Sequence, residues 1–265
     1  MLWAELFSRA GKPELNLALL PNNSSISFLL LDIEGTTTPV DFVYETLFPF
    51  ASAAVELYLH RHSAEPEVRL LLNELRAEQV ADAAMDPQVG VWMRGTVEEE
   101  IATAGNYVRH LIATDRKTTP LKTLQGKIWE EGYRRGELRG EVYDDVPRAF
   151  ELWKEKGKRI AIFSSGSVLA QKLLFGHSNA GDLRKYIDAY FDTTTGPKRE
   201  AASYKAIGNA LGAATRSMLF VSDVAQELDA AGDAGMYTAL MVRPGSSQPA
   251  DSRHARIESF DQLLV

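Results

Sequence analysis

Four short apolar runs, separated by longer stretches of helical pattern, most constrain what this chain can fold into. The runs span residues 28–31, 159–163, 217–221 and 237–242. Beyond Pro147 they alternate with helical stretches, which is typical of a parallel sheet with helices on both faces. The sequence therefore predicts an α/β fold built on a doubly wound parallel sheet.

About a hundred residues with helical periodicity lie between the first run and the second. Because the first strand finds its partners only in the second half of the chain, we interpret this block as an insertion carried on the sheet. The predicted division is an N-terminal extension at 1–25, which could be flexible, a catalytic core at 26–42 and 148–265, and a helical cap at 43–147. Apolar residues of the block repeat at the 3.6-residue spacing of packed helices: Val68, Leu71, Leu72 and Leu75; Val97, Ile101, Ala104, Val108 and Leu111; Leu121, Leu124, Ile128 and Trp129.

The composition excludes several classes of protein. The chain has 265 residues, 45% of them hydrophobic, which is enough to bury a sizeable core. A net charge of -7 argues against binding to nucleic acid or to an anionic membrane. There is no cysteine, so thiolate chemistry is excluded, and no apolar run approaches the roughly 20 residues that span a bilayer. We expect a soluble, cytoplasmic protein without nucleic-acid or membrane partners.

Polar residues follow the apolar runs directly, and ligands of open parallel sheets bind outside the carboxyl ends of the strands. Asp32 ends the first run, where its carboxylate could attack phosphorus and give an aspartyl-phosphate that water later hydrolyses. Glu34 lies two residues further on. It could serve as acid and base if the two environments push the pKa values of the carboxyl groups apart.

Three later positions complete a possible phosphate site. Ser164 and Ser165 follow the second run, and their hydroxyls and backbone N–H groups at a helix start suit a phosphate. Asp223 follows the third run and, with Asp32, could hold magnesium. Lys198 could neutralise charge on the nucleophile and on the transferring phosphoryl group.

Each of these residues also has a simpler explanation. An Asp or Ser after a strand is often only the N-cap of the next helix, and Ser167 could do no more than cap the helix that begins at Val168. A single lysine such as Lys198 is commonly a solvated surface residue. The ordered set of Asp, Ser, Lys and Asp, three of them at strand ends, favours the phosphate site.

Residues 30–40, Leu-Leu-Asp-Ile-Glu-Gly-Thr-Thr-Thr-Pro-Val, resemble the first motif of the haloacid-dehalogenase-like phosphatases. Glu34 replaces their usual second Asp, which is typical of the enolase-phosphatases (acireductone synthases). The resemblance covers the chain from about Ile26 to its end. It continues through Asp115-Arg-Lys-Thr-Thr, Leu124-Gln-Gly, residues 164–178, Phe191-Asp-Thr, Ser222-Asp-Val and Val242-Arg-Pro-Gly.

The resemblance implies a site and a cofactor. One Mg²⁺ per subunit would be bound by Asp32, Asp223 and the backbone carbonyl of Glu34. The implied catalytic residues are Asp32 as nucleophile, Glu34 and Lys198, and the implied substrate contacts are Ser164, Ser165 and Lys198. Pro197 before the lysine and Arg199 after it depart from the family pattern.

The resemblance also implies a reaction with two stages. In methionine salvage, 2,3-diketo-5-methylthiopentyl-1-phosphate would be enolised and then dephosphorylated to the acireductone, with magnesium needed for both stages and the helical cap excluding water. The base that removes the carbon-bound proton stays open between Glu34 and polar groups of the cap such as Lys117. We expect a monomer whose partner is this small phosphorylated substrate.

Three other functions compete with this one. Another capped phosphatase, acting on phosphoglycolate or a sugar phosphate, would share every core residue and differ in its cap. A phospho-accepting receiver module orders Asp, Ser or Thr, and Lys along a similar sheet but has no use for so long a helical insert. A nicotinamide-dependent oxidoreductase is disfavoured, because no Gly-x-Gly-x-x-Gly opens the first helix after a strand.

Overall fold

The computed structural model describes residues 25–93, 95–246 and 253–263, so the predicted extension at 1–25 lies, but for its last residue, outside the described part. The described residues divide into two compact units. The first takes those up to Thr38, Tyr143–Ser165 and those from Lys185 on, and the second takes Pro39–Val142 and Gly166–Arg184. The predicted cap at 43–147 has nearly the same bounds as the first segment of the second unit, Pro39–Val142, but the second unit also includes Gly166–Arg184. The domain assignment itself stays a prediction.

The first unit is built on a six-stranded parallel sheet with the strand order β3-β2-β1-β4-β5-β6. The bounds are β1 (Phe28–Leu31), β2 (Arg159–Phe163), β3 (Ala189–Phe191), β4 (Met218–Ser222), β5 (Tyr237–Met241) and β6 (Ala255–Ile257). All four residues of β1 are buried, as expected for an apolar run at the centre of a parallel sheet. Leu31 lies opposite Ile162 and Val221, so the three central strands end at the same edge.

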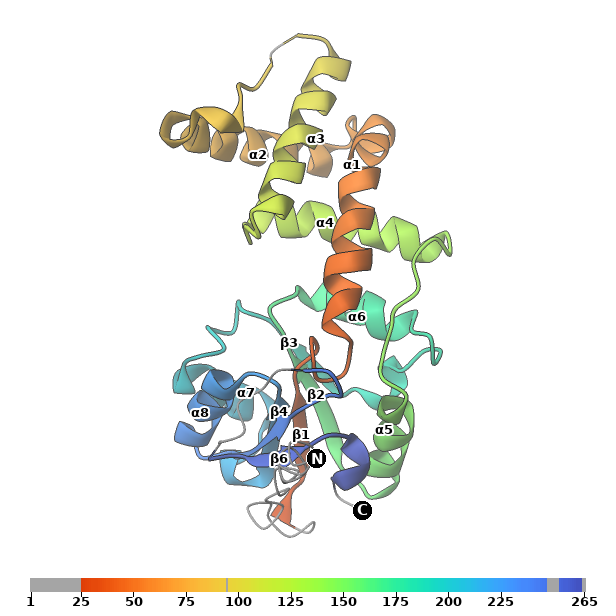
Figure 1. Ribbon diagram of the computed structural model, residues 1–265, viewed down its shortest axis with the longest axis vertical. Coiled ribbons are helices and arrows are strands. Elements are labelled where there is room, and N and C mark those ends of the chain that lie inside the picture. The colour runs from red at the N-terminus through yellow and green to blue at the C-terminus, as the bar shows by residue number, and fades with distance from the viewer. Residues whose placement is uncertain (1–24, 94, 247–252, 264–265) are drawn as a thin grey trace, which may run out of the picture. The chain divides into compact units, whose positions relative to one another are not determined.

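Helices cover both faces of the sheet, which confirms the predicted doubly wound α/β fold. Figure 1 shows α7 (Ala201–Leu211) and α8 (Ala225–Asp233) on one face and α5 (Asp145–Glu155) on the other. On the first face, Phe28 and Leu30 belong to one buried cluster with side chains of α7 and α8. Successive side chains of a strand point to opposite faces, so a wholly apolar β1 can bury both.

The strands β1 and β2 have the bounds predicted from the sequence, and the bounds of β4 and β5 differ from the prediction by one residue. β3 and β6 were not predicted. They are three residues long and form the two edges of the sheet. An edge strand is covered on fewer sides, so it needs fewer consecutive apolar residues and gives a weaker pattern.

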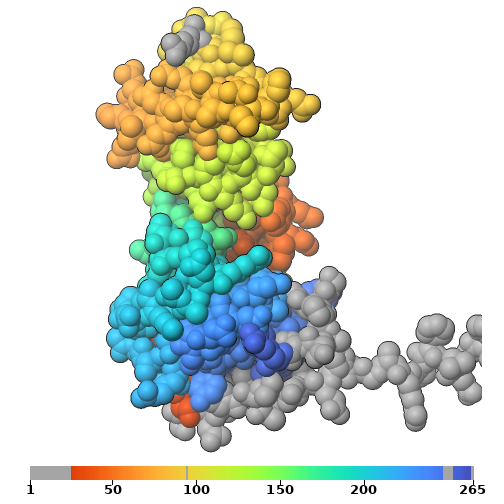
Figure 2. All heavy atoms as spheres, turned by 90° about the vertical axis from the view of Figure 1, so that its left-hand side faces the viewer, coloured from red at the N-terminus to blue at the C-terminus, as the bar shows by residue number. Residues whose placement is uncertain are grey.

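The second unit consists of helices. They are a π-helical turn at Phe42–Leu47, α1 (Phe48–His62), α2 (Pro66–Met85), α3 (Val97–Ala113), α4 (Thr119–Arg134) and α6 (Val168–Gly176). Thr96 and Glu99 form a capping box that fixes the start of α3. In Figure 2 the side chains of α2, in orange, pack on those of α4, in yellow-green.

The predicted apolar stripes are buried, with one exception. Val97 is 57% exposed, so its assignment to the α3 stripe was wrong. It is the first residue of α3, and a helical side chain covers the turn on the N-terminal side of its own Cα. At this position that turn belongs to the preceding loop and not to the packed part of the helix.

Short 3₁₀ turns complete the described chain, at Pro87–Val89 in the second unit and at Arg184–Tyr186, Thr215–Ser217 and Phe260–Gln262 elsewhere. Within residues 25–93, 95–246 and 253–263, no helix is both long and apolar enough to cross a membrane.

Leu75 and Leu70 lie on the same helix, α2, but are 0% and 60% exposed. We expect Leu75→Ala to lower the free energy of unfolding by about 2–5 kcal/mol, because it removes buried methyl groups and leaves a cavity. The matched control Leu70→Ala should change it by less than about 0.5 kcal/mol. Urea denaturation followed by circular dichroism measures both, and equal losses would contradict the packing described for α2.

Candidate functional site

Asp32 lies at the carboxyl end of the central strand, between the ends of its two neighbours. Its backbone N–H donates to Val221 O of β4 at 3.0 Å, which continues the ladder one residue past β1. The side chain is buried, with the residue 2% exposed, and its Oδ1 accepts a hydrogen bond from Ile33 N at 2.8 Å. Ser164 follows β2 on one side and Asp223 follows β4 on the other, as the strand-end argument predicted.

Lys198 contacts Asp32 directly. Its Nζ lies 2.6 Å from Asp32 Oδ1 and 2.6 Å from Glu227 Oε2. The loop that carries Lys198 is fixed by the start of α7, because Tyr204 Oη donates to Lys198 O at 2.6 Å and Ser203 Oγ donates to the preceding carbonyl at 2.7 Å. The ammonium is therefore held between two carboxylates by a loop with little freedom.

Glu227 is a member of this cluster that the sequence analysis missed. It lies in the first turn of α8, four residues after Asp223. Ser222 Oγ lies 3.2 Å from both Glu227 Oε2 and Asp32 Oδ2, so its single proton can be donated to either carboxylate. The available signal was a carboxylate one helical turn beyond the strand-end Asp, where a side chain points back toward the strand.

The charges of the cluster affect one another. Burial alone would lower the pKa of Lys198, but the carboxylates of Asp32 and Glu227 outweigh it and raise that pKa. Burial, and then the charge of Asp32, raises the pKa of Asp223 to about 7 and that of Glu227 to about 7. Three carboxyl groups around one ammonium leave an excess of negative charge, so the cluster favours a bound cation.

The turn after β1 brings Asp223 close to the backbone of Gly35. The amides of Thr36, Thr37 and Thr38 all donate to Ile33 O, at 3.1, 2.8 and 2.9 Å. Gly35 has a φ of +69°, a left-handed conformation that favours glycine. A Cβ at this position would collide with the carboxylate of Asp223.

The other predicted site residues follow two of the strands: Glu34 comes after β1, and Ser164 and Ser165 come after β2. Glu34 is half-buried within the turn that follows β1. Ser164 is buried, and its N–H donates to Phe191 O of β3 at 3.2 Å. Ser165, half-buried, is the last residue of its segment of the first unit. Ser167 caps α6 by accepting a hydrogen bond from Ala170 N at 3.3 Å, as its simpler explanation predicted.

The predicted donor atoms are of the kind that magnesium prefers. Within the described part of the chain, no group of three or more His, Cys, Asp or Glu side chains could hold a metal ion. The predicted ligands need no such group, because they are two carboxylates, of Asp32 and Asp223, and the main-chain carbonyl of Glu34. Mg²⁺ is usually bound by one or two carboxylates and keeps several waters for substrate oxygens to replace.

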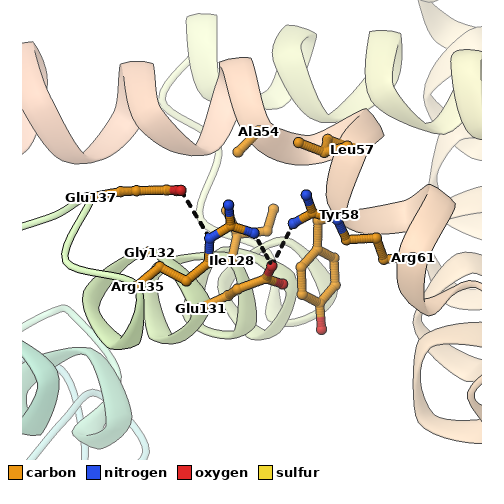
Figure 3. A pocket seen from close by; sticks show the side chains of 9 residues that line it. All are labelled: Ala54, Leu57, Tyr58, Arg61, Ile128, Glu131, Gly132, Arg135 and Glu137. Atoms are coloured by element: carbon orange, nitrogen blue, oxygen red, sulfur yellow. Dashed lines mark hydrogen bonds and ion pairs between the residues drawn. The ribbon is translucent and has the colours of Figure 1, made fainter.

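A small pocket in the second unit is a poorer candidate for a binding site. Its volume is about 50 Å³, and Figure 3 shows Arg61 and Arg135 both directed at Glu131. Arg61 Nη1 lies 2.7 Å and Arg135 Nη1 3.3 Å from Glu131 Oε1, and Arg135 Nε donates to Glu137 at 2.8 Å. The guanidinium groups are paired, and the volume suits only a few water molecules.

Comparison with known proteins assigns the class. Residues 26–235 match the haloacid dehalogenase-like hydrolase family, which agrees with the parallel sheet and with a carboxylate at the end of its central strand. The chain is therefore a haloacid dehalogenase-like hydrolase.

Curated relatives narrow this class. The chain is 50% identical over 244 residues to Enolase-phosphatase E1 of Synechococcus elongatus, covering 92% of this chain and all of the relative. It is 44% identical over 241 residues to Enolase-phosphatase E1 of Pseudomonas aeruginosa, covering 91% and 99%. Among solved structures, the UTR4 protein of Saccharomyces cerevisiae superposes with a TM-score of 0.72 at 36% identity, covering 90% of this chain and all of that one. The chain belongs to the enolase-phosphatase family.

Gly35→Ala tests the contact between the turn and Asp223. We expect hydrolysis of p-nitrophenyl phosphate to fall about a hundredfold, since displacing a reacting group by about 1 Å has an effect of that order. Gly136→Ala is the matched control, because Gly136 has a φ of +71° and nothing within 4 Å of an added Cβ. Similar losses in both variants would mean that backbone strain alone explains the effect.

Proposed function

We propose that this chain is a magnesium-dependent enolase-phosphatase that converts 2,3-diketo-5-methylthiopentyl-1-phosphate to the acireductone and phosphate in methionine salvage. The observation that carries the proposal is the buried carboxylate of Asp32 at the end of β1, with Lys198 Nζ 2.6 Å from its Oδ1. Relatives 44–50% identical along the chain, named Enolase-phosphatase E1, support the choice of substrate. We propose a monomeric, cytoplasmic enzyme with one Mg²⁺ per subunit.

In the phosphatase stage, Asp32 is the nucleophile. A carboxylate oxygen forms a bond to phosphorus as the bond between phosphorus and the substrate's C1 oxygen breaks, and the leaving oxygen takes a proton from Glu34, the proposed acid. Glu34 then takes a proton from water, which attacks phosphorus and releases phosphate and the Asp32 carboxylate. The hydrogen bond from Ile33 N to Oδ1 orients the carboxylate, and Ser222 Oγ lies 3.2 Å from Oδ2. Lys198, held protonated by its two carboxylate partners, offsets the negative charge as nucleophile and phosphoryl group approach.

Asp32, Asp223 and the carbonyl of Glu34 are the proposed ligands of magnesium, and Ser164 and Ser165 the proposed contacts of the phosphate. When bound, the ion would lower the repulsion between an anionic nucleophile and an anionic phosphate and polarise substrate oxygens during enolisation. The position of Asp223 supports this assignment, because it follows β4, the neighbour of β1, and its carboxylate lies against the turn that carries Glu34, where a Cβ on Gly35 would collide with it.

For the enolisation stage, Glu34 and polar groups of the cap such as Lys117 remain the candidate bases. Glu34 is half-buried in the turn that follows Asp32. Lys117 belongs to the second unit, where its Nζ lies 3.5 Å from Asp115 Oδ2 and its side chain is 49% exposed. Glu34 lies two residues after the proposed nucleophile, in the same turn, so we favour Glu34.

Asp32→Asn should lower phosphate release from the diketo substrate by on the order of a thousandfold or more, as loss of a nucleophile does. Chelation of magnesium by EDTA should stop release by the unchanged enzyme, and added Mg²⁺ should restore it. Asp261→Asn, at an exposed carboxylate paired with Arg148, is the control and should keep full activity. Undiminished release from Asp32→Asn, or release from phosphoglycolate but not from the diketo ester, would refute the proposal.

Glu34→Gln separates the two stages. The amide cannot accept the carbon-bound proton, so the ultraviolet absorbance of the enol should appear at least about tenfold more slowly, within the usual contribution of a general base. The backbone carbonyl is unchanged, so magnesium should still be bound. Lys117→Met is the comparison, and an unchanged enolisation rate in Glu34→Gln would exclude Glu34 as the base.

A further inference from the structure

Arg243, just after β5, holds a buried position that the proposed chemistry does not use. The residue is 6% exposed, and its Nη1 lies 2.7 Å from Oδ2 of Asp145, which is also buried. Its guanidinium carbon lies 4.0 Å from the ring centroid of Tyr143 and 5.0 Å from that of Phe260. The arginine is therefore enclosed by packing as well as by charge.

The other donors of Arg243 reach the turn that carries the nucleophile. Nε and Nη2 both donate to Thr36 O, at 3.1 and 2.6 Å. The guanidinium thus bridges two acceptors, a carboxylate and a main-chain carbonyl, which suits its rigid fork of donors. A lysine ammonium in the same place could not reproduce this geometry.

Hydrogen bonds within the turn connect this contact to Asp32. Thr36 N, Thr37 N and Thr38 N share the acceptor Ile33 O, and Thr37 Oγ1 donates to Asp32 O at 3.1 Å. A shift of the Thr36 carbonyl would therefore move the backbone of Asp32 with it. Tyr143 N adds a hydrogen bond to Thr37 O at 3.1 Å from beside the arginine.

Asp145, the ion-pair partner of Arg243, is held by further hydrogen bonds. Asp145 Oδ2 also accepts hydrogen bonds from Ser259 Oγ at 2.9 Å and from Phe260 N at 2.7 Å. The backbone carbonyl of Arg243 accepts hydrogen bonds from Ser246 N at 3.0 Å and from Ser246 Oγ at 2.8 Å, which close the turn after β5. Both ends of the ion pair are anchored to the first unit.

Stability alone does not account for such a pair. Burying two charges costs desolvation energy, and apolar residues of similar volume often serve as well or better. What only the arginine supplies is a doubly hydrogen-bonded support for one carbonyl of the turn between Asp32 and Thr38. We propose that Arg243 is a positioning residue, which holds this turn so that the Asp32 carboxylate and the Glu34 carbonyl keep their places; this inference rests on the proposed function.

Arg243→Lys tests the proposal with the charge kept. We expect kcat per folded molecule to fall about ten- to a hundredfold, as for a slightly misplaced reacting group, with KM changed less than about twofold because the turn carries the nucleophile. Amide hydrogen exchange in residues 33–38 should become faster. Asp145→Asn, which leaves Arg243 in place, should give the same changes to a smaller extent.

Arg148→Lys is the matched control. Arg148 also connects α5 to the 3₁₀ turn at Phe260–Gln262, through an ion pair with Asp261, and this ion pair does not involve residues 32–38. It should leave kcat and the exchange of residues 33–38 unchanged. A normal kcat and normal exchange in Arg243→Lys, whatever its melting temperature, would overturn the positioning role, as would failure of both Arg243→Lys and Asp145→Asn to fold.

The assay should use p-nitrophenyl phosphate beside the diketo substrate. Hydrolysis of the first but not the second by the unchanged enzyme would contradict the proposed substrate and would leave the comparison of kcat values intact. Activity on neither ester would contradict the proposed function, and hydrogen exchange would still report whether Arg243 holds the turn.

Discussion

The buried ammonium of Lys198 between the carboxylates of Asp32 and Glu227 is the interaction on which the rest of the site depends. Each carboxyl group alone would be costly to bury, and the shared cation makes the arrangement possible. The lysine reaches this position because hydrogen bonds from Tyr204 and Ser203 hold the loop before α7. Its single charge does not balance three carboxyl groups, which is why the site suits a further cation.

The sheet provides the geometry that this balance needs. Three neighbouring strands, β2, β1 and β4, end at one edge, so residues far apart in sequence meet after Leu31, Phe163 and Ser222. The turn after β1 then has to pass close to Asp223, and only a glycine in a left-handed conformation leaves room at Gly35. Arg243 contacts the same turn through its two hydrogen bonds to Thr36 O.

Much of this could be predicted from the sequence, because buried parallel strands are short unbroken apolar runs and the polar residues that follow them share an edge. That reasoning led to Asp32, Ser164 and Asp223, and the central strands were found within one residue. The edge strands β3 and β6 escaped it because they are short and partly exposed. Glu227 and Arg243 escaped because their ion-pair partners, Lys198 and Asp145, are 29 and 98 residues away, and no local pattern encodes such contacts. The roles of the predicted site residues stay predictions.

The most direct measurement is a crystal structure of the enzyme grown with Mg²⁺ and beryllium fluoride, an analogue of the phosphoryl group. The account predicts a fluoroberyllate joined to a carboxylate oxygen of Asp32, the ion bound by that residue, by Asp223 and by the carbonyl of Glu34, and the ammonium of Lys198 within hydrogen-bond distance of the analogue. A fluoroberyllate on another side chain, or an ion bound away from Asp223, would contradict it.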